Sequence, residues 1–579
     1  MKTIINSKSM KLIALIGIFM LPVIGLIFIV LKYAVNMPIT DDYGSVLGWL
    51  NNFIANPNNQ TRLPMLFDQH GEHRIVFNRI IELIQLHCFG KVNFIYLSLF
   101  GMLGLIINLC LIIKLSISKG LKAIHLIPLP YLLLSLSQWE LIDWAMASIA
   151  QYWQLFFSVT AIIFITSAKN YSIYIIGLMF VILAIFTGGG GLMIFPVIIL
   201  YYILTRAKFH KIAIWIGFTS IIFYIYFILL NYAKTSDNGI NLSIISQNLK
   251  LIILYLFCFL GGMFYGNCDI LTNLALMSGL LLFIVFLFLT YKKTYLKQPE
   301  LYCIMLFIIF IAGGASVTRF HEGIMSASGS RYTIYTGLFL VTIYITILLE
   351  FKNQQNIITK YGSVIAIFIY LLWLPNGITC LNTRYNNLNQ KLMTTTIDQG
   401  YNILHQAVQN KIFFPLPNIA QNLPYNLPLN NGQLYKNGYD GNIDYLNYTN
   451  GRMIGIGWGV IRNSPDLPVT AILKIDRNYY PLNYGEIIRP DVVKNKKNKA
   501  YLKCGYKFTL NIHDLLNRCL SCAQPFGAEY YNPKNTNNNQ PVYVRELSII
   551  LVDQNRHIFY PSPCIKINLS DLNHIKFLK

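Results

Sequence analysis

The stretch Leu12-Ile-Ala-Leu-Ile-Gly-Ile-Phe-Met-Leu-Pro-Val-Ile-Gly-Leu-Ile-Phe-Ile-Val-Leu31 decides the fold class of this chain. It carries no charge and is long enough to cross about 30 Å of hydrocarbon at about 1.5 Å per residue. Lys2, Lys8 and Lys11 precede it, which places the N-terminus in the cytoplasm. A cleaved signal peptide is the alternative, but the apolar run is too long and no small-residue cleavage site follows closely. We therefore expect a retained membrane helix.

The composition of the whole chain agrees with this start. Of its 579 residues, 55% are hydrophobic and 12% are charged, which excludes an ordinary soluble multidomain protein. The formal net charge of +22 would suit a nucleic-acid-binding protein, but the basic residues are dispersed and no binding motif accompanies them. Anionic lipid, or a phosphorylated lipid substrate, is the partner class that the charge favours.

Short basic loops recur between the hydrophobic runs, and the positive-inside rule places those loops in the cytoplasm. Residues 249–264 would move Lys292 and Lys293 to the outer face if they spanned the membrane, so we expect a short interfacial or re-entrant helix there. The chain then crosses eleven times and leaves its C-terminus outside. The predicted spans are 12–31, 92–113, 121–137, 151–167, 171–186, 191–205, 212–231, 270–290, 301–317, 333–350 and 360–376.

A long outer loop, residues 32–91, follows the first span. In its second half, 73–89, apolar residues recur close to helical spacing among polar ones, which predicts an amphipathic helix in the membrane interface. A twelfth span is the alternative. The charges of Arg74, Arg79 and Glu82 argue against burial in lipid.

The composition changes sharply after Pro375. Residues 380–579 are rich in Asn, Tyr, Pro and Gly, and the alternating runs 471–475 and 542–552 predict strands. Asn-Gly and Asp-Gly pairs within 425–450 suit hairpins or sugar-contacting loops. The fold class is therefore a polytopic α-helical membrane protein, residues 1–379, with a C-terminal soluble, mainly β or α+β domain outside the membrane.

Four of the ten cysteines lie beyond residue 500, in the body of the C-terminal domain. An even number on an oxidising face predicts two disulfides, with three connectivities open. A zinc site is the minority alternative because only one CxxC is present. The four residues are Cys504, Cys519, Cys522 and Cys564.

Acidic residues gather on one predicted face. Of the 12 Asp and Glu residues in 1–379, ten fall in outer segments, which indicates a reaction site or ion site there because charge near lipid is costly.

Asp41 and Asp42 follow the first span directly. Adjacent side chains point in different directions, so one can face a reacting centre while the other holds a loop, a cation or a second substrate. A helix N-cap for residues 43–54 is an equally weighted alternative.

Three further outer segments carry polar residues in unusual density. Asp68-Gln-His-Gly-Glu-His-Arg74 predicts a polar pocket in which carboxylates orient histidines or help bind a metal, and Arg binds phosphate; an ion-paired turn is the alternative. The segment 138–153 sets two acids beside three tryptophans, which suit interfacial anchors or a wall contacting sugar or lipid. The segment 319–332 has two arginines that could clamp a lipid phosphate or simply snorkel to headgroups. The residues concerned are Glu72, His73, Arg74, Glu140, Asp143, Arg319, His321, Glu322, Arg331 and Tyr332.

Four consecutive glycines, Gly188–Gly191, lie at a predicted outer turn. They lack the Lys-Ser/Thr partner of a P-loop. Tight helix packing and a bare backbone near a lipid explain the run equally well.

With Asp41-Asp42-Tyr43 just after the first span, an interfacial helix after it and a soluble domain after the last span, the chain resembles the GT-C class of membrane glycosyltransferases. That class includes protein O-mannosyltransferases, the aminoarabinose transferases that modify lipid A, and oligosaccharyltransferase catalytic subunits. The Gly-Glu-His-Arg-Ile and Ser-Arg-Tyr runs look like those of poorly characterised bacterial polytopic proteins of the same class. A Trp-Trp-Asp signature is absent from the sequence, which argues against a protein Asn acceptor.

The resemblance implies transfer of a sugar from a polyprenyl-phosphate carrier to a hydroxyl on a glycan or lipid, with inversion, at the outer face of a bacterial inner membrane. It assigns Asp41 or Asp42 as general base. Arg74, Arg319 or Arg331 would neutralise the leaving group, and a divalent metal ion near Asp42, Glu72 and His73 is a further expectation. The rivals are a transporter or flippase for a lipid-linked or anionic substrate, and a non-catalytic membrane assembly protein.

Overall fold

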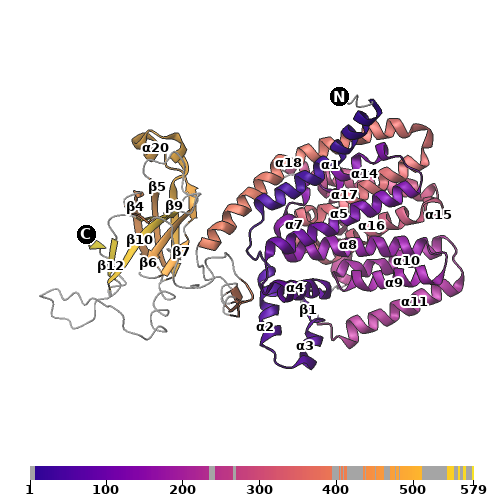
Figure 1. Ribbon diagram of the computed structural model, residues 1–579, viewed down its shortest axis with the longest axis horizontal. Helices are drawn as coiled ribbons and strands as arrows, with labels where there is room; N and C mark the ends of the chain where they lie inside the picture. Colours follow the sequence, from indigo (N-terminus) through magenta and orange to yellow (C-terminus); the bar gives the residue numbers. More distant parts are fainter. Residues whose placement is uncertain are drawn as a thin grey trace, which may run out of the picture. The chain divides into compact units, whose positions relative to one another are not determined.

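A computed structural model describes residues 7–233, 242–264 and 269–393, together with shorter stretches between 403 and 578. It contains two compact units (Figure 1). The helical unit comprises Met1–Tyr385 and Asn410–Phe413, and the second unit comprises Asn386–Gln409 and Phe414–Lys579. The first boundary between the two units therefore follows Tyr385, close to the domain boundary that the sequence predicts between residues 379 and 380.

The helical unit is built from long apolar helices joined by short helical turns. Its main helices are α1 (Ser7–Tyr33), α2 (Trp49–Ala55), α3 (Asn59–Met65), α4 (Val76–Phe89), α5 (Phe94–Ser118), α6 (Pro128–Leu133), α7 (Glu140–Asp143), α8 (Ala145–Thr166), α9 (Tyr171–Ile185), α10 (Ile194–Leu204), α11 (Phe209–Phe223), α12 (Leu242–Gln247), α13 (Leu249–Leu260), α14 (Asp269–Tyr291), α15 (Thr294–Lys297), α16 (Pro299–Arg319), α17 (Thr333–Glu350) and α18 (Gln355–Met393). The turns η1 (Tyr43–Gly48), η4 (Gly189–Met193), η5 (Tyr224–Leu229), η7 (Phe320–Glu322), η8 (Ile324–Ser328) and η9 (Ser330–Tyr332) connect some of them.

Among the described residues, eight helices are long and apolar enough to cross a membrane. The chain is thus a helical membrane protein, as predicted, and eight of the eleven expected spans fall on these helices. The other three fall on shorter apolar helices, Ala123–Gln138, Tyr171–Ile185 and Gly189–Leu204. The first of these consists of short helical pieces, and Pro128 begins one of them, α6, at a position where the missing backbone N–H costs no helical hydrogen bond. The segment Leu249–Leu260 is also short, in agreement with its interpretation as a non-spanning helix.

The polar contacts at the two ends of the helices involve different residues. At one end, Lys119 of the loop after α5 binds Glu300 of α16 at 2.7 Å, and Ser167, just after α8, binds the same carboxylate at 2.7 Å. Lys297, the last residue of α15, binds Glu350, the last residue of α17, at 2.8 Å. The N-terminus of α8, about 33 Å away at 1.5 Å per residue, instead meets Asp42. The first outer loop therefore lies at the end opposite Glu300.

The C-terminal unit contains two antiparallel-rich sheets. The predicted strands appear as β6 (Thr470–Ile475) and β10 (Val544–Val552), which pair with each other from Leu547↔Ile475 to Val552↔Thr470. A seven-stranded sheet is completed by β3 (Leu434–Lys436), β7 (Asn478–Pro481), β11 (Ile558–Tyr560), β12 (Ile565–Asn568) and β13 (Phe577–Leu578). The second sheet has the order β4-β5-β9-β8, formed by β4 (Tyr439–Thr449), β5 (Arg452–Ile461), β9 (Gly505–Asn511) and β8 (Asn483–Ile487).

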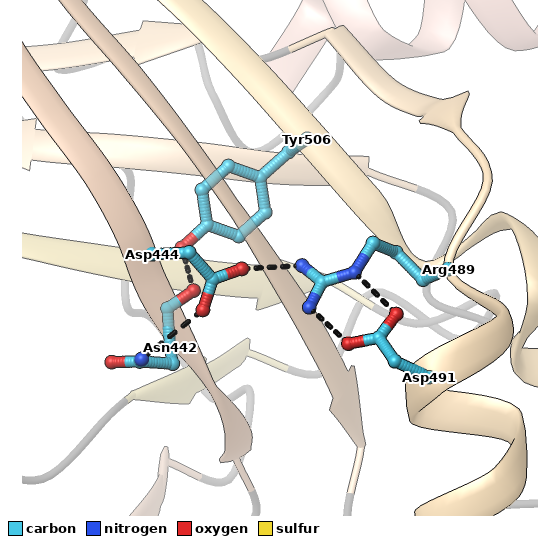
Figure 2. A network of polar contacts seen from close by, with 5 residues as sticks. All are labelled: Asn442, Asp444, Arg489, Asp491 and Tyr506. Carbon is cyan, nitrogen blue, oxygen red and sulfur yellow. Dashed lines mark hydrogen bonds and ion pairs between the residues drawn. The ribbon is translucent and has the colours of Figure 1, made fainter.

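A charged network fastens this second sheet to helix α20 (Pro490–Lys496), as Figure 2 shows. Arg489 binds Asp444 of β4 at 2.5 Å and both carboxylate oxygens of Asp491 at 2.6 and 2.9 Å. Its guanidinium also lies 6.0 Å from the Trp458 ring centre. Cys504 is buried in the small core below α20, while Cys519, Cys522 and Cys564 lie outside the described residues. The disulfides stay a prediction.

Candidate functional site

The two adjacent aspartates of the first loop have different environments. Asp42 is fully buried; its Oδ2 accepts a hydrogen bond from the backbone N–H of Ile39 at 3.0 Å and its Oδ1 from that of Met146 at 2.9 Å. Asp41 is exposed. The Asp42 side chain does not cap the following turn, so the N-cap alternative is not what the structure contains. Asp42 instead ties the loop to the start of α8.

Burial is the main influence on the Asp42 carboxyl. It raises the pKa of Asp42 to about 7, against the opposing effect of the two backbone N–H groups. The charges of Asp41 and Asp143 add to the rise. Asp42 therefore titrates near neutral pH, whereas Asp41 is the member of the pair that water and a ligand can reach.

A small hairpin follows in the same loop. Its strands β1 (Gln69–His70) and β2 (His73–Arg74) pair so that His70 lies directly opposite His73, and Gly71 supplies the left-handed turn conformation at φ +53°. Gln69 fixes the hairpin to Ala233 through two hydrogen bonds of 2.7 and 2.9 Å. In Figure 1, β1 lies with α2, α3 and α4 on one side of the helical unit.

The hairpin histidines are influenced by burial and by neighbouring charges. Burial lowers the pKa of His70, and the charge of Asp41 opposes this effect. Burial likewise lowers the pKa of His73, with Glu72 opposing and Arg319 adding to the fall. Both imidazoles are therefore neutral at pH 7, and each is within reach of one charge, that of Asp41 for His70 and that of Arg319 for His73.

The glycine run supports His73 by close packing. A Cβ atom on Gly189 would come within 2.3 Å of His73 Nδ1, and one on Gly190 within 2.8 Å of Gln154 Oε1. Gln154 is buried and lies close to the phenol of Tyr335, at 3.4 Å. Of the two explanations for the run, the structure supports tight packing.

Two buried arginines form the frame of the loop. Arg74 is 2% exposed and donates to the carbonyls of Phe67, Tyr226 and Leu230, the last at 2.7 Å. Arg79 donates to three carbonyls between residues 65 and 68, at 2.6 to 3.1 Å. The guanidinium of Arg74 thus binds backbone oxygens and is not directed at a ligand. Arg319 and Arg331 remain as candidates for the expected phosphate contact.

Helix α4 presents its polar face to the protein and its apolar face outward. Asn78, Arg79, Glu82 and Gln85 are buried, at helical spacing, while the exposed large residues are Ile80, Ile84 and Phe89. This arrangement fits the predicted interfacial helix, because lipid would contact the apolar side. The charges that argued against a membrane span are turned inward.

Glu82 is the group that sequence reasoning missed as a site residue. It is fully buried, and neither carboxylate oxygen has a hydrogen-bond partner within the described part of the chain. Burial raises the pKa of Glu82 to about 8, with Arg79 opposing and Asp42 adding to the rise. The polar spacing of residues 78, 82 and 85 on one face was the signal that could have identified it.

The second outer segment is held by Arg384, which is another residue that the sequence did not reveal. Arg384 binds Asp143 Oδ1 at 2.7 Å, donates to the carbonyl of Glu140 at 3.1 Å and stacks 4.5 Å from the Trp139 ring centre. Burial raises the pKa of Asp143 to about 6 despite Arg384. Trp139 thus serves as a platform for a cation.

Glu140 joins the second outer segment to the third. Its Oε2 accepts from the backbone N–H of Arg331 at 3.1 Å, and its own N–H donates to Ser330 Oγ at 3.0 Å. Arg319 lies 3.5 Å from Glu322, and the guanidinium of Arg331 lies 5.0 Å from the Tyr332 ring centre. His321 is exposed, and Tyr332 is buried.

The expected metal site is not supported by these positions. In the part of the chain that the structure describes, no three His, Cys, Asp or Glu side chains are grouped to hold a metal ion. Both oxygens of the buried Asp42 accept backbone hydrogen bonds, and the divalent ion near Asp42, Glu72 and His73 stays a prediction.

Searches of protein-family models, curated proteins and solved structures found no match to this chain. What the site can do is therefore argued from its own geometry.

Proposed function

We propose that the chain is an inverting glycosyltransferase that moves a sugar from a polyprenyl-phosphate carrier to a hydroxyl of a glycan or lipid, at the outer face of the membrane. One observation carries the proposal. The aspartate pair is divided into a buried, loop-fixing Asp42 and an exposed Asp41, and the paired hairpin residues His70 and His73 lie within reach of the charges of Asp41 and Arg319, respectively.

In this proposal Asp41 is the general base. The acceptor hydroxyl attacks the anomeric carbon, its proton passes to the Asp41 carboxylate, and the bond from that carbon to the phosphate oxygen breaks with the electron pair on the phosphate. Asp42 is a positioning residue, because its two backbone contacts fix the loop that carries Asp41 against α8.

Arg319 is the proposed partner of the leaving phosphate. A guanidinium stays charged and matches phosphate oxygens in two parallel hydrogen bonds. Arg319 is only partly buried and its ion pair with Glu322 is long, so it can reorient. Arg331 is the second cation of the same segment. The basic loops at the opposite end support an extracytoplasmic position for this site.

A proton-coupled transporter is the second candidate, and Glu82 favours it. Ionisable groups buried in membrane proteins often carry protons, and Glu82, Asp42 and Asp143 are buried with raised pKa values. In a transporter Glu82 would load and release a proton during each cycle. In the transferase it would remain protonated at neutral pH.

The two candidates separate in one experiment on the purified full-length chain in lipid vesicles. Radiolabelled polyprenyl-phosphate sugars are supplied with a crude glycan and lipid acceptor fraction, and a pH-sensitive dye inside the vesicles reports proton movement. The transferase predicts labelled product, lost in Asp41→Asn and retained in Glu82→Gln. Proton uptake that depends on Glu82, without labelled product, would instead establish the transporter.

A further inference from the structure

The turn after α16 places an acid against the proposed phosphate-binding arginine. Arg319 Nη1 lies 3.5 Å from Glu322 Oε1, and the two side chains are 29% and 36% exposed. Gly323, the next residue, has φ +90° and ψ 156°, a conformation open essentially to glycine. The pair is an i,i+3 contact across the turn η7, and Gly323 ends that turn directly after Glu322.

Glu322 acts on the second arginine as well. Its negative charge attracts the guanidinium of Arg331, and so does the charge of Glu140. The segment is held from the other side by α13, where the phenol of Tyr255 contacts Ser326 at 3.2 Å. Glu322 therefore contacts Arg319 and influences Arg331 only at longer range.

This placement is unusual for a residue expected to contact phosphate. A carboxylate repels a phosphate, so Glu322 cannot assist an anionic ligand by direct contact. It does form an ion pair with Arg319 while no such ligand is bound. The long 3.5 Å separation and partial exposure mark a weak, replaceable contact rather than a fixed structural pair.

We propose that Glu322 is an internal counter-anion that occupies Arg319 in the free protein and is displaced when the phosphate group of a lipid carrier binds. The inference rests on the proposed function for the identity of that lipid. Glu322 thereby lowers affinity for phosphates and limits retention of the carrier phosphate released after transfer. Such a contact sets how strongly a ligand must bind in order to compete.

The test measures binding of polyprenyl monophosphate to the full-length chain in phosphatidylcholine nanodiscs, with no acceptor present. Glu322→Gln should bind about two- to fivefold more tightly, the range expected for release of one exposed ion pair. Glu350→Gln is the matched control, because it removes the same charge at the opposite end of the helices, where Glu350 pairs with Lys297. It should leave the affinity unchanged.

A double-mutant cycle tests whether the effect passes through Arg319. In an Arg319→Ala background, which should bind polyprenyl phosphate more weakly, the gain from Glu322→Gln should disappear. Phosphatidate and inorganic phosphate serve as further probes: a gain for both lipids but not for the free ion indicates a site at the lipid surface, and a gain for all three indicates a general phosphate site. Either result supports the displacement.

The proposal is overturned if Glu322→Gln binds no more tightly than the natural chain, if Glu350→Gln shows the same gain, or if the gain persists without Arg319. These outcomes are independent of catalysis. Tighter binding without sugar transfer in any assay would keep the displacement and reject the transferase, while transfer with unchanged binding in Glu322→Gln would do the reverse.

Discussion

Replacing Glu82 by glutamine should stabilise the protein, and the gain should grow with pH. Glutamine keeps the size of the side chain and removes its ability to ionise. The folded chain holds the Glu82 proton until about pH 8, whereas an unfolded chain releases it near the ordinary value of 4.5. The contribution of this group to stability is therefore fully present below about pH 4.5 and is lost as the pH rises to about 8.

The magnitude follows from the same shift. Each pH unit between the two pKa values costs the natural protein about 1.4 kcal/mol, so the full window corresponds to on the order of 5 kcal/mol. Relaxation of the buried site makes this an upper figure. Near pH 5 the variant and the natural protein should differ by no more than about 1 kcal/mol, because both side chains are then neutral. By pH 8 the variant should be several kcal/mol more stable.

The assay is the free energy of unfolding of the full-length chain in mixed micelles, followed by tryptophan fluorescence from pH 5 to pH 8.5. Glu72→Gln is the control, since Glu72 is exposed in the same loop and its loss changes no buried charge. A Glu82→Gln variant that is less stable than the natural protein at pH 8, or whose advantage does not vary with pH, would refute the reasoning.

Three further changes test other parts of the structure. Asp42→Asn should cost about 1–3 kcal/mol, because an amide cannot accept both backbone hydrogen bonds that the carboxylate accepts. Gly189→Ala should lower the melting temperature by crowding His73, a cost of about 1–3 kcal/mol, whereas Gly217→Ala meets open space and should be neutral or stabilising. Arg489→Ala should destabilise the C-terminal unit by about 1 kcal/mol, less at high salt, because its contacts with two carboxylates are lost.

Each of these has a distinct contrary result. Unchanged unfolding in Asp42→Asn would mean that the first loop is held by other contacts. Equal melting of Gly189→Ala and Gly217→Ala would remove the packing role of the glycine run. If the Arg489→Ala variant keeps the protease resistance of the natural C-terminal unit at both low and high salt, the network of Figure 2 contributes no stability.

Features that depend on local pattern could be predicted from the sequence. The apolar runs, the amphipathic helix of the first outer loop and the strands around 471–475 and 542–552 each depend on a periodicity that a short window contains. The count of eleven spans stays a prediction, because three of the expected spans fall on apolar helices shorter than 18 residues.

The site depends on contacts between distant residues, which a single sequence does not contain. Asp42 meets Met146, and Asp143 meets Arg384, 241 positions away. The choice between Asp41 and Asp42 was open for the same reason, since only the neighbouring helix determines which side chain is buried. Glu82 was visible in the sequence as a charge, but its inward direction follows from the packing of α4.

The most direct measurement of the central claim is the single-turnover rate of sugar transfer by Asp41→Asn, with polyprenyl-phosphate-linked donor in vesicles. General-base catalysis predicts a loss of about 10²- to 10⁴-fold, with donor binding and folding preserved because Asp41 is exposed. A transfer rate equal to that of the natural chain, or the absence of transfer by the natural chain with every polyprenyl-linked donor and acceptor fraction supplied, would contradict the account.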